Sequence, residues 1–169
     1  TQQLAKNLFN KGGSSSTVKR LTQKVKEWIV ATKLERQYTK NEIVAMYLNT
    51  QGFLFNAIGI RSASRIYFGK EPKDLDIQES AILVAMLKNP RQFNPNREIS
   101  KGKSLIRRNV VFAQMAKNEF ITEQEKDSLQ QLPLKINFTP ESHNDGLATY
   151  FREYLRDYLK KWTKNNPKP

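Results

Sequence analysis

Apolar side chains recur at helical spacing along most of the chain. The clearest run extends from Val18 to about Tyr38, and the Ser/Thr-rich stretch before it offers an N-cap. This spacing predicts a long helix, and weaker periodic runs predict helices at about 57–67 and 101–118. Capping boxes, in which Thr or Asp is followed three positions later by Glu, predict helices near 40–49, 77–88 and 123–131.

Proline and glycine mark the breaks between these helices. Residues 89–95 must be largely non-helical, because proline excludes the α conformation from the residue before it. Lys11-Gly12-Gly13 and the serines after it predict a loop, and a second break covers Gln131 to Glu141. The best strand signal, Leu134 to Phe138, is weak, and an aromatic stripe from Leu147 to Trp162 predicts a C-terminal helix. The predicted fold class is all-α.

Charge and composition limit the classes of partner and of chemical site that the chain can have. Lys and Arg number 29 against 16 Asp and Glu, so a net charge of +13 favours an anionic partner: nucleic acid, anionic lipid or a phosphate-bearing substrate. The absence of cysteine excludes disulfides and thiolate metal sites, and a single histidine, His143, argues against a histidine metal site or a Ser-His triad. No run of about 18 apolar residues predicts a membrane span.

The N-terminal region concentrates the candidate chemistry. Six Lys or Arg residues and no acidic residue precede Glu27. On a helix Arg20, Lys24 and Glu27 share one stripe, so a single carboxylate has a cationic surround that could bind phosphate. The alternative is a solvated basic helix face with one ion pair, which the spacing alone favours.

A polar row precedes this stripe. Its side chains lie on successive helical turns and could hold a polyhydroxyl or pyrophosphate ligand, although an ordinary helix surface explains them equally well. A second basic cluster, residues 91–108, could contact a phosphate backbone or anionic lipid, but no RNA-binding signature accompanies it. The row consists of Gln2, Gln3, Lys6 and Asn7.

Several motifs resemble those of the family 51 glycosyltransferases, which polymerise lipid II into glycan strands in class A penicillin-binding proteins. Thr1 to Asn7 is similar to the end of the family's second motif, Gly-x-Ser-Thr-Ile-Thr-Gln-Gln-Leu-x-Lys-Asn. Matches to the third, fourth and fifth motifs follow in the family's order over about 110 residues, which makes the resemblance specific. They are Lys24-Val25-Lys26-Glu27 with Lys33 to Asn49, then Gly59-Ile60 with Tyr67-Phe68-Gly69-Lys70, then Asn89-Pro90, Phe93-Asn94-Pro95 and Arg107-Arg108.

The resemblance implies a lysozyme-like helical fold and an inverting transfer that forms β-1,4-linked glycan. Glu27 matches the second of two catalytic carboxylates, which supports the donor side of the reaction. The residues implied to bind the pyrophosphate and sugar of lipid II are Gln2, Gln3, Lys6, Asn7, Lys19, Arg20 and Lys24. No metal ligand is implied, and the pattern does not decide whether a divalent cation, Mg or Mn, assists.

This chain also departs from the family pattern. Gln23 replaces an arginine that usually precedes Lys24, and Leu54 stands where a glycine is common. The first motif, Glu-Asp-x-x-Phe-x-x-His-x-Gly, supplies the base and is absent from the 169 residues. We therefore expect an N-terminally truncated donor-side half of the site, inactive by itself.

The C-terminal segment resembles the connector to a transpeptidase domain. We expect residues 1–132 to belong to the glycosyltransferase domain and 133–169, including His143, to the connector, whereas no transpeptidase motif is present. The implied partners are lipid II, the growing glycan, moenomycin-type inhibitors, that transpeptidase domain and the inner-membrane surface, and nucleic acid is not among them. The resemblance implies a location at the periplasmic face of the inner membrane, held by an N-terminal anchor outside this chain. The alternative is a basic helical module that binds nucleic acid or anionic membrane without catalysis.

Overall fold

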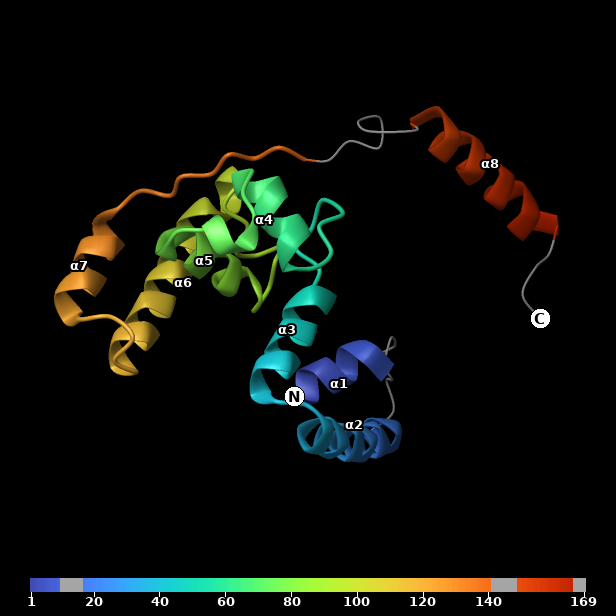
Figure 1. Cartoon of the computed structure of the whole chain (residues 1–169), viewed down its shortest axis with the longest axis horizontal. Helices are drawn as coiled ribbons and strands as arrows, with labels where there is room; N and C mark the ends of the chain where they lie inside the picture. Colours follow the sequence, from blue (N-terminus) through green and yellow to red (C-terminus); the bar gives the residue numbers. More distant parts are fainter. Residues whose placement is uncertain (10–16, 141–148, 166–169) are drawn as a thin grey trace. The chain divides into compact units, whose positions relative to one another are not determined.

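The computed structural model describes residues 1–9, 17–140 and 149–165 as two compact units, Thr1–Thr139 and Pro140–Pro169 (Figure 1). Within these ranges the regular elements are helices, so the all-α prediction is confirmed. Predictions made for Lys11 to Ser16 and for Ser142 to Ala148 lie outside the described residues. The helices are α1 (Gln2–Phe9), α2 (Thr17–Gln37), α3 (Lys40–Thr50), α4 (Ile60–Phe68), η1 (Pro72–Asp74), α5 (Ile77–Met86), α6 (Glu98–Lys117), α7 (Glu123–Gln131) and α8 (Thr149–Asn165).

Three helices begin where the capping boxes predict. The side chains of Thr39, Asp76 and Thr122 each accept a hydrogen bond from the backbone N–H three positions later, and the Glu at that position accepts from the cap's own N–H. Two N–H groups that the first turn leaves unpaired are satisfied in this way. The starts of α3, α5 and α7 are therefore confirmed and are fixed by local sequence.

The predicted helix at 57–67 is wrong at its start, because α4 begins at Ile60. The preceding residues form a turn closed by an isolated antiparallel bridge between Gly52 and Ile58. Inside this turn Leu54, Phe55 and Asn56 have φ values of 68°, 49° and 62°. Residues 57–59, which periodicity assigned to the start of the helix, therefore precede α4.

The segment with the weak strand signal is extended but pairs with a helix end. Asn137 N–H donates to Tyr67 O at 2.9 Å, and Thr139 N–H donates to Ile66 O at 2.8 Å. These carbonyls end α4 and have no partner within the helix. Residues 134–138 therefore cap α4 and add Leu134, Ile136 and Phe138 to the core.

The core of the first unit lies between α4, α5 and the turn before α4. The Tyr67 ring is fully buried, and its hydroxyl donates to the backbone oxygen of Phe53 at 2.8 Å. Burial raises the pKa of Tyr67 far above its ordinary value. The core side chains are Phe53, Ala57, Ala63, Ile66, Tyr67, Phe68, Ile82, Leu83 and Met86.

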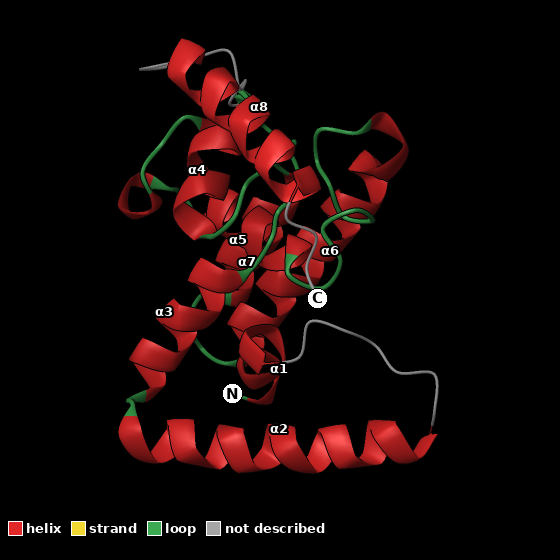
Figure 2. Cartoon of the chain, turned by 90° about the vertical axis from the view of Figure 1, so that its right-hand side faces the viewer, coloured by secondary structure: helices red, strands yellow, loops and turns green. Residues whose placement is uncertain are grey.

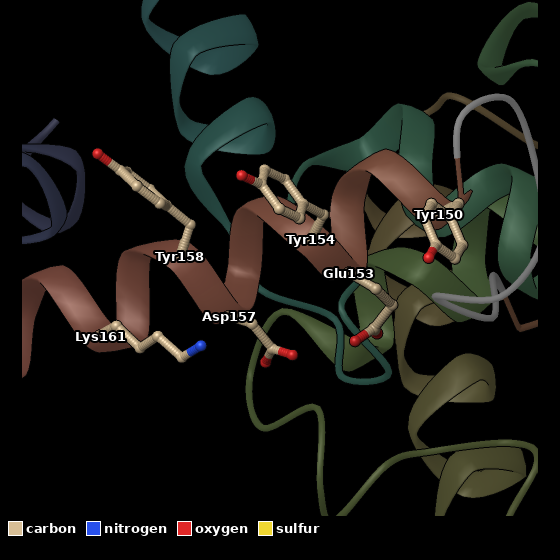
Figure 3. A pocket seen from close by; sticks show the side chains of 6 residues that line it. All are labelled: Tyr150, Glu153, Tyr154, Asp157, Tyr158 and Lys161. Carbon is tan, nitrogen blue, oxygen red and sulfur yellow. The ribbon is translucent and has the colours of Figure 1, made fainter.

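The second unit consists of α8 and its flanking residues. Figure 3 shows Tyr154 and Tyr158 projecting from one side of the helix, with Glu153 and Asp157 on the other. The helix carries a shallow surface hollow of about 380 Å³, lined by these four side chains together with Tyr150 and Lys161. Helix α8 confirms the predicted C-terminal helix, while its role as a connector and the division at residue 132 remain predictions. Among the described helices, none has the length and apolar character that crossing a membrane requires.

Candidate active site

Helices α1, α2 and α3 pack against one another, so the helices that carry the predicted site residues are neighbours (Figures 1 and 2). Helix α1 lies over α2 and beside α3, and its Leu4 and Ala5 are buried. The polar residues of α1 alternate with this apolar pair, as an amphipathic helix requires. The packing therefore places the polar row of α1 and the basic face of α2 in neighbouring elements.

Glu27 is a buried carboxylate on α2. Only 4% of the residue is exposed, and each carboxylate oxygen accepts a hydrogen bond from the preceding turn. Lys24 Nζ donates to Oε2 at 3.1 Å, and Gln23 Nε2 donates to Oε1 at 3.4 Å. Since an unpaired buried charge is strongly unfavourable, these two donors compensate for lost hydration.

The ion pair is asymmetric in its exposure to water. The Lys24 side chain is 57% exposed, whereas that of Glu27 is 3% exposed. A solvated i,i+3 pair would expose both partners and contribute little to stability. The interpretation of Glu27 as part of an ordinary solvated helix face is therefore wrong, although the predicted pair with Lys24 is present.

The orientation of α2 is the reverse of that in a typical surface helix. Its buried residues are Glu27 and Ala31. The apolar side chains of Leu21, Val25 and Trp28 are 66%, 45% and 53% exposed. A helix whose only role was to cover a core would turn its apolar stripe inward. The stripe that carries the carboxylate faces inward instead.

Gln23 shows how the departure from the family pattern is accommodated. An arginine there would place a second cation beside Glu27, whereas the amide of Gln23 supplies a neutral donor to the same carboxylate. Lys19 and Arg20 lie exposed near the start of α2, ahead of Lys24. The exposed cations and the buried carboxylate thus occupy one helix.

The polar row of α1 divides into two groups. Gln2 and Lys6 are exposed, while Gln3 Nε2 donates to Asn7 Oδ1 at 3.3 Å. Asn7 Nδ2 in turn donates to Gln51 Oε1 at 2.6 Å. The sequence interpretation missed Gln51, which lies two positions beyond the third motif, because no periodicity or spacing connects it with α1.

The fourth motif is held by ion pairs. Arg61 Nε and Arg65 Nε each donate to the Glu71 carboxylate at 2.8 Å, and Lys70 Nζ donates to Glu79 at 2.7 Å. The two arginines hold the pKa of Glu71 below its ordinary value, and the hydrogen bond to Glu79 raises the pKa of Lys70. The arginine pairs join α4 to the segment that follows it, and the Lys70–Glu79 pair joins that segment to α5, so these pairs are structural.

One arginine of the second basic cluster does not reach the surface. Arg108 is fully buried, donates to Gln130 O at 3.2 Å and lies 5.4 Å from the centre of the Phe112 ring. Burial lowers the pKa of Arg108. Its hydrogen bond to Gln130 joins α6 to α7, and its burial makes it unavailable to an anionic partner. Among the described residues, no group of three His, Cys, Asp or Glu side chains is placed to hold a metal ion.

Together, the fold and the site define a domain whose described elements are helices and whose buried carboxylate, Glu27, lies on a basic helix. The sequence model of one family, described as Transglycosylase, matches residues 1–116, which is more than half of the chain. The chain therefore belongs to the transglycosylase family, and the resemblance drawn from the motifs is confirmed.

Relatives agree with this assignment over nearly the whole chain. Penicillin-binding protein 1A of Aquifex aeolicus (strain VF5) is 32% identical over 159 residues, covering 94% of this chain and 20% of that protein. Penicillin-binding protein 1A of Escherichia coli (strain K12) is 35% identical over 160 residues, covering 94% and 18%. The chain thus spans about a fifth of the length of these relatives.

A solved structure supports the fold. The chain resembles penicillin-binding protein 1A from Haemophilus influenzae with a TM-score of 0.57 and 24% identity, covering 95% of this chain and 20% of that one. At this identity the likeness bears on the fold alone, and it agrees with the all-α architecture.

Proposed function

We propose that this chain is the donor-side part of a peptidoglycan glycosyltransferase that polymerises lipid II into β-1,4-linked glycan strands for the cell wall. The observation that carries the proposal is Glu27, a carboxylate buried on a basic helix within the residues matched to the transglycosylase family. Relatives named penicillin-binding protein 1A support the same assignment.

The reaction requires a developing charge to be stabilised. The 4-hydroxyl of an incoming lipid II attacks the sugar C1 of the growing chain, the bond from C1 to the pyrophosphate oxygen breaks, and configuration at C1 inverts. Cations fixed beside the departing pyrophosphate stabilise its negative charge. On this chain Lys24 is the cation anchored to Glu27, and Lys19 and Arg20 extend the basic face along α2.

The proton of the attacking hydroxyl must pass to a base. We assign Glu27 to the donor side, where it orients Lys24 and supports proton movement near the pyrophosphate, rather than to deprotonation of the acceptor. The base motif does not occur in the 169 residues. A further segment of a longer protein would supply it, and we expect this chain by itself not to polymerise lipid II.

The setting follows from the substrate. Lipid II carries its sugars on a membrane-embedded lipid, so the proposed enzyme works at the periplasmic face of the bacterial inner membrane. The growing glycan, moenomycin-type inhibitors and a transpeptidase domain of the same protein are the other proposed partners. Nucleic acid is not among the proposed partners.

The test is turnover of fluorescent lipid II by the full-length protein. Glu27→Gln keeps the approximate shape of the side chain but removes its charge and replaces one acceptor oxygen with a donor NH2 group, so we expect a loss of about 100-fold or more in kcat/KM. Glu98→Gln is the matched control, because the Glu98 side chain is 90% exposed on α6. Helical circular dichroism should be unchanged in both variants. Retained turnover in Glu27→Gln would return Glu27 to a structural ion pair.

A further inference from the structure

The C-terminal end of α3 contributes a side chain to the polar row of α1. Gln51 Oε1 accepts a 2.6 Å hydrogen bond from Asn7 Nδ2, although the two residues lie 44 positions apart. Asn7 Oδ1 accepts a second bond, of 3.3 Å, from Gln3 Nε2. The three amides form a chain that starts on a half-buried residue of α3 and ends on the exposed face of α1.

The three amides are arranged head to tail in this network. Gln51 presents its oxygen to the Asn7 nitrogen, and the Asn7 oxygen is turned toward the Gln3 nitrogen. Gln3 is left with its own oxygen and one N–H for a ligand. Side-chain rotamers held by such bonds are already ordered before a ligand binds, which reduces the entropic cost of binding.

Gln51 is itself held by the backbone. It ends α3 in an extended conformation, with φ −75° and ψ 137°, and its carbonyl accepts a 2.7 Å hydrogen bond from Gly59 N–H. The loop between these residues contains the three successive positive φ values at 54–56. This conformation is unfavourable by about 1–2 kcal/mol for residues such as Leu54 and Phe55, and strain of this kind persists where the surrounding structure requires the geometry.

We propose that Gln51 is a positioning residue that sets the amides of Asn7 and Gln3 for the sugar-pyrophosphate of the donor. The inference rests on the proposed function and adds to it a residue that the motifs do not include. Gln51 acts through Asn7 and does not itself contact substrate. Its influence should therefore disappear when Asn7 is removed.

A double-mutant cycle in the full-length protein tests this dependence. KM and kcat for fluorescent lipid II are measured for Gln51→Ala, Asn7→Ala and the double variant. Gln51→Ala should raise KM about 5- to 10-fold, the effect of one lost hydrogen bond, with kcat within about twofold. In the Asn7→Ala background the same change should have no further effect on KM. Gln51→Glu keeps an acceptor oxygen and should recover most of the loss.

Controls separate positioning from stability. Gln124→Ala, at an exposed position of α7, should leave KM and Tm unchanged. If Gln51 only stabilised the fold, the variants would lower Tm, and their effects on KM would add in the double variant. Additive effects, or an unchanged KM in Gln51→Ala, would overturn the inference while leaving the proposed function intact. A wild-type protein with no lipid II turnover would instead overturn the proposed function and this inference with it.

Discussion

Gly59 offers the sharpest prediction about how the fold supports the site. Its φ of 83° and ψ of 159° fall in a region that is almost exclusive to glycine. A Cβ at this position would lie 2.9 Å from the backbone oxygen of Asn49. A backbone atom at the end of α3 cannot move aside as a flexible side chain would. Gly59→Ala should therefore strain both the turn and the helix end.

The expected magnitude combines two effects. The unfavourable backbone conformation contributes about 1–3 kcal/mol, and the overpacking contributes about 1–3 kcal/mol more. The lower entropy of unfolded alanine offsets about 0.5–1 kcal/mol. Gly59→Ala should thus reduce the free energy of unfolding by about 1–5 kcal/mol. It should also raise KM, because Gly59 N–H holds the carbonyl of Gln51.

The matched control is the same substitution in a helix. Gly102 lies within α6, and nothing lies within 4 Å of a Cβ built there. Gly102→Ala should stabilise the protein by about 1 kcal/mol, since alanine is the better helix former. Urea denaturation followed by circular dichroism measures both variants. Equal stability of Gly59→Ala and wild type, or the same sign of change for both substitutions, would refute the reasoning.

Two further predictions concern the ion pairs and the core. The lowered pKa of Glu71 means that its pairing with the arginines contributes stability above its unfolded pKa of about 4.3, and loses it as pH falls through the folded pKa. Glu71→Gln should therefore flatten the acid limb of stability against pH, and an unchanged limb would contradict the assignment. Tyr67→Phe leaves the buried Phe53 carbonyl without its 2.8 Å partner and should cost about 1–3 kcal/mol in a urea titration, whereas a wild-type midpoint would show that the bond is replaced.

Local sequence determined much of the helical framework. Capping boxes at Thr39, Asp76 and Thr122 act within four residues, so their positions could be predicted without knowledge of the fold. Leu54 illustrates the limit of such prediction. Its φ of 68° lies in the left-handed region that glycine favours, although the residue here is leucine. Periodicity could not detect this turn and began the helix at about residue 57, three residues before α4 begins.

The candidate site was determined only in part by the sequence. The motifs identified Glu27, its cation Lys24 and the polar row of α1, and the helical spacing of Glu27 and Lys24 was enough to pair them. Gln51 could not be found in this way, because its hydrogen bond to Asn7 depends on how α3 packs beside α1. A contact between residues 44 positions apart leaves no local trace in the sequence.

The orientation of α2 shows most clearly what tertiary structure decided. By itself the sequence predicted a helix from Val18 to about Tyr38 with an apolar stripe and a basic stripe carrying Glu27, and α2 confirms that helix. Which stripe is buried depends on the partner helix, and α1 packs so that Glu27 and Ala31 face inward while Trp28 remains 53% exposed. Helix formation depends on hydrogen bonds within four residues, whereas burial depends on surfaces that only the folded chain brings together.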